Sequence, residues 1–165
     1  MPWRCNSTPI NGAQDVALKG TNQEFGRPYN RRIVLESIRL HGPVTRGDVA
    51  ERVGLTVQTV STIVRELEEQ GYLLSLREEP KGRGLPPAML SINPEGGFAI
   101  GIHVTPRGID AALIDLSGNV VGGLHEEAAS ASPDDAFAVI GRMVPELKAL
   151  RPGGRILGAG MALPG

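Results

Sequence analysis

Short hydroxyl and amide side chains gather on one face of a predicted helix in the first half of the chain. Residues 45–71 read TRGDVAERVGLTVQTVSTIVRELEEQG, and the polar face of their second helix carries Gln58, Thr59, Ser61, Thr62 and Arg65. A merely solvated face normally fills with Glu and Lys, whereas these groups let a helix approach phosphates and bond to base edges. The pattern favours recognition of double-stranded DNA.

Two helices and a tight turn must position this face. Thr45 and Asp48 have the spacing of a capping box, Gly54 suits a helix end with positive φ, and Thr56 is a good N-cap for the second helix. The apolar residues of that helix predict a buried stripe of Val57, Val60, Val64 and Leu67, with Ile63 beside it. This is the helix-turn-helix arrangement, whose second helix enters the major groove. The alternative is an ordinary helical hairpin packed against a core.

Gln58 is the best candidate for a base contact, because an amide can bond adenine bidentately. Thr56, Thr59 and Thr62 are expected to contact phosphates or pyrimidine methyls. The full set of residues expected to contact DNA is Thr45, Arg46, Thr56, Val57, Gln58, Thr59, Ser61, Thr62, Arg65, Lys81 and Arg83.

Flanking segments complete a winged helix. A helix is expected over residues 28–40, with Ile33, Val34 and Ile38 buried, and Arg27, Arg31 and Arg32 lie near its start, where arginines can touch phosphate. Residues 72–77 and 88–92 predict two short strands joined by a Gly/Pro-rich loop. Lys81 and Arg83 at the tip of this wing can reach a minor groove. An ordinary hairpin loop is the other interpretation.

The second half begins after a linker signal at residues 93–97. Strand-like runs at 98–104 and 109–116, and a turn leading into Val120, precede a helix opened by Ser132 and Pro133. The expected apolar face of that helix comprises Phe137, Ile140, Val144, Leu147 and Leu150, and residues 156–165 read as a further buried strand. The predicted order is β-β-β-α-β.

Composition limits the class of protein. The 165 residues are 41% apolar and 21% charged with a net charge of −1, which is typical of a globular protein. Cys5 alone cannot form an internal disulfide or a zinc cluster, and no apolar run reaches the ~20 residues of a membrane span. We expect a cytoplasmic protein without cofactor or metal. Its expected parts are a disordered N-terminus (1–22), a DNA-binding domain (23–93), a linker (94–97) and a second, partial domain (98–165).

The sequence resembles the transcriptional repressors of the ROK family over about residues 20–165. The residues that carry the resemblance are GTNQ at 20–23, the block GLTVQTVSTIVRELEEQGYL, the KGRG wing at 81–84 and LSINP at 90–94. The resemblance implies an α+β protein: a winged helix-turn-helix followed by the start of a sugar-kinase-like domain of ribonuclease-H-like fold. It implies a repressor of carbohydrate-metabolism genes that binds its operator as a homo-oligomer and responds to a sugar-type effector.

The second domain departs from the kinases of that family. Their GIDIGGTK-type phosphate loop corresponds here to GIHVTPRG, in which His103 replaces the acidic residue and Thr105 and Pro106 replace glycines. Proline removes an N–H donor, and loss of the glycines prevents close backbone approach to phosphate. We therefore expect no enzyme activity and no ATP binding. A sugar kinase with an added N-terminal module is the alternative, and a module that binds protein is a third. His41, His103 and His125 are expected to be structural.

Residues 158–165 resemble the GxGxPG strand of the family. In the family the sugar-contacting residues, the catalytic aspartate and the zinc motif all follow that strand. We therefore expect that this chain neither binds an effector sugar nor dimerises as tightly as a longer relative. Whether it is a fragment or a truncated gene product stays open.

Overall fold

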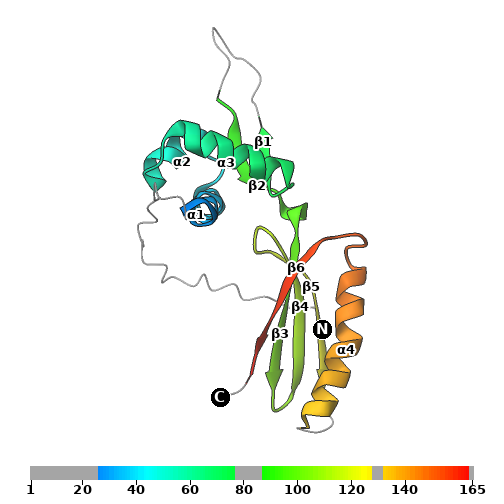
Figure 1. Cartoon of the computed structure of the whole chain (residues 1–165). Helices are drawn as coiled ribbons and strands as arrows, with labels where there is room; N and C mark the ends of the chain where they lie inside the picture. Colours follow the sequence, from blue (N-terminus) through cyan, green and yellow to red (C-terminus); the bar gives the residue numbers. More distant parts are fainter. Residues whose placement is uncertain (1–25, 77–86, 128–131, 164–165) are drawn as a thin grey trace. The chain divides into compact units, whose positions relative to one another are not determined.

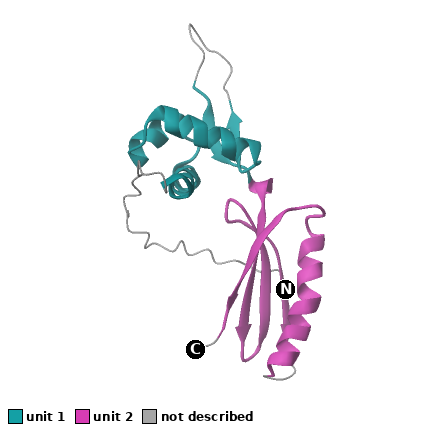
Figure 2. Ribbon diagram, viewed as in Figure 1, with its two compact units in different colours: residues 1–93 teal, residues 94–165 magenta. Residues whose placement is uncertain are grey.

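The chain forms two compact units, residues 1–93 and residues 94–165, which are coloured separately in Figure 2. The computed structural model describes residues 26–76, 87–127 and 132–163. The expected disordered segment 1–22 and the wing-tip residues Lys81 and Arg83 lie outside the described residues.

The first unit contains three helices and a two-stranded sheet (Figure 1). The helices are α1 (Gly26–His41), α2 (Arg46–Val53) and α3 (Val57–Glu69), and strands β1 (Leu73–Leu76) and β2 (Met89–Ile92) pair antiparallel. Each of these elements was predicted from the sequence, with boundaries that differ by one or two residues.

One apolar cluster holds the first unit together. Its buried residues come from all three helices, the turns between them and both strands: Ile33, Val34, Ile38, Val44, Val49, Ala50, Val53, Leu55, Val60, Ile63, Val64, Leu67, Leu73 and Leu90. The predicted stripe on α1 is confirmed. On α3 the prediction is wrong for Val57, which is 54% exposed, while Ile63 lies within the core. Helical side chains lean toward the N-terminus, so Val57, the first helical residue, projects beyond the packed turns.

A backbone bridge that the sequence did not indicate ties the helices to the wing. Val44, between α1 and α2, pairs antiparallel with Leu90 of β2. The N–H of Leu90 donates to the carbonyl of Val44 at 2.7 Å, and the N–H of Val44 donates back at 3.1 Å. The strands of the wing are therefore fixed to the helical core at their base.

The second unit is a four-stranded sheet with one helix on it. After a short 3-10 helix (Pro94–Gly96) come β3 (Phe98–Thr105), β4 (Gly108–Asp115), β5 (Val120–Glu127), α4 (Pro133–Ala149) and β6 (Ile156–Ala162). The strand order is β5-β4-β3-β6, and β6 runs parallel to β3. The predicted α+β class and the β-β-β-α-β order are confirmed.

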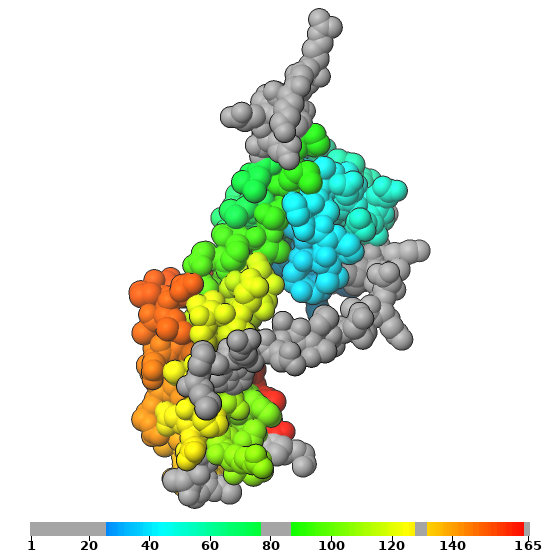
Figure 3. All heavy atoms as spheres, turned by 180° about the vertical axis from the view of Figure 1, so that it is seen from behind, coloured from blue at the N-terminus to red at the C-terminus, as the bar shows by residue number. Residues whose placement is uncertain are grey.

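Helix α4 covers one face of this sheet. Figure 3 shows α4 in orange beside yellow β5, and α4 also contacts β3 and β4. Its buried residues are Val139, Met143 and Leu147, whereas Phe137 is 65% and Leu150 41% exposed. The predicted apolar face was therefore wrong at both ends. A row of residues four apart faces the sheet, and Ile140 and Val144 flank it half-buried.

Strand β6 is an exposed edge strand, not the buried strand that its apolar sequence predicted. From Leu157 to Ala162 every residue of β6 is exposed. Helix α4 packs on the other three strands, so pairing with β3 gives β6 backbone partners without burying its side chains. Within the described parts of the chain, no helix is both long and apolar enough to cross a membrane.

Substitution of Val57 and of Val60 on α3 tests which of the two valines belongs to the core. Val60 is fully buried and Val57 is 54% exposed. We expect Val60→Ala to lower the free energy of unfolding by about 2 kcal/mol, through lost burial and a residual cavity. Val57→Ala should change it by less than about 0.5 kcal/mol.

Chemical denaturation followed by intrinsic fluorescence measures this difference. Trp3 lies outside the described residues, so both variants are made in a Trp3→Phe background. Tyr29 and Tyr72 are the two tyrosines of the chain and both belong to the first unit, so tyrosine fluorescence reports that unit. Equal losses in the two variants would contradict the assignment of Val57 to the surface.

Candidate nucleic-acid interface

A reciprocal cap fixes the start of α2. The backbone N–H of Thr45 donates to Asp48 Oδ2 at 2.9 Å, and the Thr45 hydroxyl accepts from the N–H of Asp48 at 3.2 Å. The hydroxyl of Thr45 also donates to Asp48 Oδ2, at 2.7 Å. The predicted capping box is confirmed. The backbone and side-chain hydrogen bonds from Thr45 hold the pKa of Asp48 below its usual value.

The turn between α2 and α3 has the predicted conformation. Gly54 adopts φ 67°, which a residue with a side chain rarely takes, and its N–H donates to the carbonyl of Ala50. Leu55 is buried and anchors the turn in the core. Thr56 then caps α3, because its hydroxyl accepts from the N–H of Thr59 at 3.1 Å.

The outward face of α3 contains free and occupied polar groups. The Thr56 and Thr59 hydroxyls lie 2.9 Å apart and share a hydrogen bond, and the Thr62 hydroxyl donates to the carbonyl of Gln58 at 3.2 Å. Among the residues that the structure describes, Gln58, Ser61 and Arg65 have no side-chain partner. Since phosphate oxygens only accept, the Thr62 hydroxyl has no hydrogen left to donate to them. Its methyl group remains available.

The far end of α3 is held by arginines from the other helices. Arg27 pairs with Glu66, and Arg31 donates to the side-chain oxygen of Gln70, the C-cap residue. Arg46, the first residue of α2, lies 3.3 Å from Glu68 Oε2. From the sequence, Arg27 and Arg31 could touch phosphate or only water, and Arg46 is one of the residues expected to contact DNA. No local pattern connects them to α3, because their partners lie 22 or 39 positions further along the chain.

The wing continues directly from α3. The N–H of Tyr72 donates to the carbonyl of Leu67 at 2.9 Å, and the side chain of Asn93 donates to the carbonyl of Gly71 at 2.8 Å. These bonds fix both ends of the hairpin at its base.

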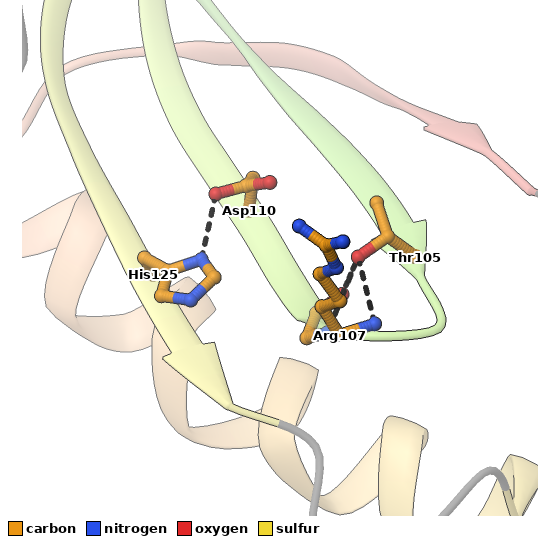
Figure 4. Close-up of polar contacts among 5 residues, drawn as sticks. Thr105, Arg107, Asp110 and His125 are labelled. Atoms are coloured by element: carbon orange, nitrogen blue, oxygen red, sulfur yellow. Dashed lines mark hydrogen bonds and ion pairs between the residues drawn. The ribbon is translucent and has the colours of Figure 1, made fainter.

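The β3–β4 turn in the second unit closes on itself (Figure 4). The Thr105 hydroxyl accepts from the N–H groups of Arg107 and Gly108, each at 3.2 Å, and donates to the carbonyl of Gly108 at 2.9 Å. Nearby, His125 Nδ1 lies 2.8 Å from Asp110 Oδ1. A search of the described residues finds no group of three or more His, Cys, Asp or Glu side chains placed to hold a metal ion.

Comparison with known proteins agrees with this geometry. Residues 27–73 match a family model described as winged helix-turn-helix DNA-binding. The xylose repressor of Caldicellulosiruptor bescii is 28% identical over 150 residues, which is 87% of this chain and 37% of that protein. An uncharacterized protein of Sinorhizobium fredii, y4fQ, is 27% identical over 140 residues, which is 82% of this chain and 35% of that protein.

A solved structure shares the fold. It is a ROK family transcriptional regulator described as a homologue of the Escherichia coli MLC protein. It superposes with a TM-score of 0.66 at 22% identity and covers 84% of this chain and 36% of its own. The chain is therefore similar in sequence to a xylose repressor and in fold to a ROK family regulator, and it spans little more than a third of the length of these relatives.

The capping box predicts a specific pH dependence of stability. The pKa of Asp48 is lowered in the folded protein, so its stabilising effect is present above the unfolded-state value and is lost as the pH falls through the folded value. Asp48→Asn keeps an acceptor but cannot titrate. We expect the melting temperature of the wild type to exceed that of Asp48→Asn at pH 6, and the gap to narrow as the pH falls below about 4.

Thermal melts of both chains between pH 3 and pH 6 measure this gap. Thr45→Ser preserves the hydroxyl and should keep the wild-type dependence. A gap that does not change with pH would show that Asp48 does not stabilise the cap through its charge.

Proposed function

We propose that this chain is the DNA-binding part of a transcriptional repressor that recognises a double-stranded operator with the N-terminal half of α3. One observation carries the proposal. The first turns of α3 expose Gln58 together with the apolar Val57, while Glu66 and Glu68 at the other end of the helix are paired with arginines of the protein. Such a face suits base edges and thymine methyls better than solvent.

The available groups suggest a division of contacts. Gln58 bonds adenine, Arg65 and Ser61 donate to phosphates, and the methyl groups of Thr59 and Thr62 contact pyrimidines. The Thr56–Thr59 pair still has one hydroxyl hydrogen to donate to a phosphate. Lys81 and Arg83 would reach the neighbouring minor groove or its phosphates from the wing. These roles rest on exposure and hydrogen-bonding capacity.

The whole protein is proposed to regulate carbohydrate-metabolism genes from the cytoplasm in response to a sugar-type effector. One relative is named a xylose repressor, which supports this class of effector for the chain. We propose that the effector site and most of the oligomer interface belong to parts of the protein outside these 165 residues. Two recognition helices about 34 Å apart would bind a palindromic operator, so a single copy should bind half-sites weakly.

A sugar kinase is the less favoured function. Phosphate binding by a loop needs free backbone N–H groups, and two N–H groups of the β3–β4 turn are bonded to the hydroxyl of Thr105. The relative from Caldicellulosiruptor bescii is named a repressor and not a kinase, which supports the same conclusion.

The main test is selection of an operator from a pool of random duplexes, followed by competition with single-base variants. We expect Gln58→Ala to lose discrimination at one A·T position by about 5- to 150-fold, the equivalent of about 1–3 kcal/mol. Glu69→Gln, at the exposed far end of the same helix, is the matched control and should keep the selected sequence. If Gln58→Ala selects the wild-type operator unchanged, Gln58 is not the specificity residue.

Val57 gives a second, independent test. Its exposed methyl groups adjoin Gln58, so we expect them to contact a thymine methyl. Replacing that thymine by uracil should weaken wild-type binding about fourfold, the equivalent of about 0.8 kcal/mol for one methyl group. Val57→Ala should bind the thymine and uracil duplexes almost equally.

Anisotropy titrations on the paired duplexes measure both constants. An equal uracil penalty in Val57→Ala and wild type would assign the methyl contact to another residue, such as Thr59.

A further inference from the structure

Polar contacts from two helices end on the last turn of α3. Arg27 and Arg31 reach it from the first turns of α1, and Arg46 reaches it from the first turn of α2. Their partners Glu66, Glu68 and Gln70 lie at the end of α3 opposite Gln58. The exposed residue Gln58 and the residues held by arginines therefore lie at opposite ends of α3.

The Arg46–Glu68 pair is the best shielded of these ion pairs. The side chain of Arg46 is 31% exposed and that of Glu68 is 26% exposed, whereas Arg27 is 73% exposed. Partial removal from water strengthens an ion pair relative to a fully solvated one. Arg46 also stands at the N-terminus of α2, where the helix dipole disfavours a cation. The carboxylate of Glu68 therefore supplies the negative charge that stabilises the Arg46 guanidinium at this position.

Apolar packing alone does not fix the rotation of α3 about its axis. Burial of Val60, Ile63, Val64 and Leu67 is non-directional, and neighbouring residues on a helix point about 100° apart. A modest rotation would move Gln58 away from a base edge while keeping much of the stripe buried. A polar pair between α2 and the end of α3 has a defined geometry and resists that rotation.

We propose that Arg46 and Glu68 form a positioning pair that sets the orientation of α3 for base reading, and that Arg46 is not a phosphate contact. The inference rests on the proposed DNA-binding function. It replaces the DNA contact that the sequence analysis expects of Arg46. Arg27–Glu66 and Arg31–Gln70 support the same end of α3 from α1.

Salt dependence distinguishes positioning from phosphate contact. Each phosphate contact adds about 0.9 to the slope of log affinity against log salt concentration. We expect Arg46→Gln and Glu68→Gln each to weaken operator binding about two- to fivefold at every salt concentration, with the wild-type slope. Arg65→Gln, which removes an exposed and unpaired arginine of α3, is the matched control and should lower the slope by about one.

A charge swap supplies the second measurement. Arg46→Glu combined with Glu68→Arg should recover most of the affinity lost by either single reversal, because the pair is restored in the opposite sense. Melting temperatures and fluorescence of each variant identify those that remain folded. If Arg46→Gln does not fold, Arg46→Lys keeps the charge and should preserve both the slope and most of the affinity.

Two outcomes would overturn the proposal. Arg46→Gln could lower the slope by about one while Glu68→Gln leaves affinity unchanged or raises it, as expected if Arg46 were freed to bind phosphate. The charge swap could also bind no better than the single reversals. These failures leave DNA binding intact, whereas a wild-type chain without sequence-dependent binding would contradict the proposed function itself.

Discussion

The burial of one side of α3 is the constraint on which the first unit depends. Val60, Ile63, Val64 and Leu67 are almost fully removed from water, and α1, α2 and the base of the wing all contribute to the same apolar cluster. Four buried aliphatic side chains each worth about 1.5–3 kcal/mol outweigh any single surface ion pair in the unit. Val57 and Gln58 are therefore not needed in the core, and both side chains lie exposed at the start of α3.

Electrostatics in this unit is local and not global. Residues 1–93 contain 12 Lys and Arg against 10 Asp and Glu, so the net charge of the unit is only +2 and its overall attraction to a polyanion is weak. Glu66 and Glu68 would repel phosphates, but each is paired with an arginine of another helix. The same contacts that hold the helix also neutralise its acidic end. An Arg that looks like a DNA ligand in the sequence can therefore favour DNA binding indirectly, by cancelling a carboxylate and fixing a helix.

The features that the sequence predicted correctly depend on interactions between residues close together in the chain. The Thr45–Asp48 cap, the positive φ of Gly54, the Thr56 cap and the stripe on α1 all depend on residues within four positions of one another. Contacts between distant segments were not predictable in this way: the Val44–Leu90 bridge and the arginine pairs have no local signature. Apolar periodicity predicted burial wrongly at the ends of helices and in the edge strand β6. Val57, Phe137 and most of β6 have apolar side chains that stay exposed among the residues that the structure describes. The exposure of Gln58 and Arg65 agrees with the predicted polar face of α3, but the sequence did not indicate which hydroxyls of that face are already hydrogen-bonded.

The parallel pairing of β3 with β6 also has a consequence for the order in which the chain folds. Strands β3, β4 and β5 are joined by tight turns and can associate as soon as they have been synthesised. The pairing of β3 with β6, which begins at Phe98 and Ile156, forms only after β4, β5 and α4 have been synthesised. Closing such a long loop is slow, because its entropy is lost before the new contacts compensate for it. On the ribosome the winged unit therefore matures first, the meander follows, and the face of β3 toward β6 stays open longest. During that interval the edge of β3 presents unpaired backbone N–H and C=O groups, which can pair with a strand of another chain.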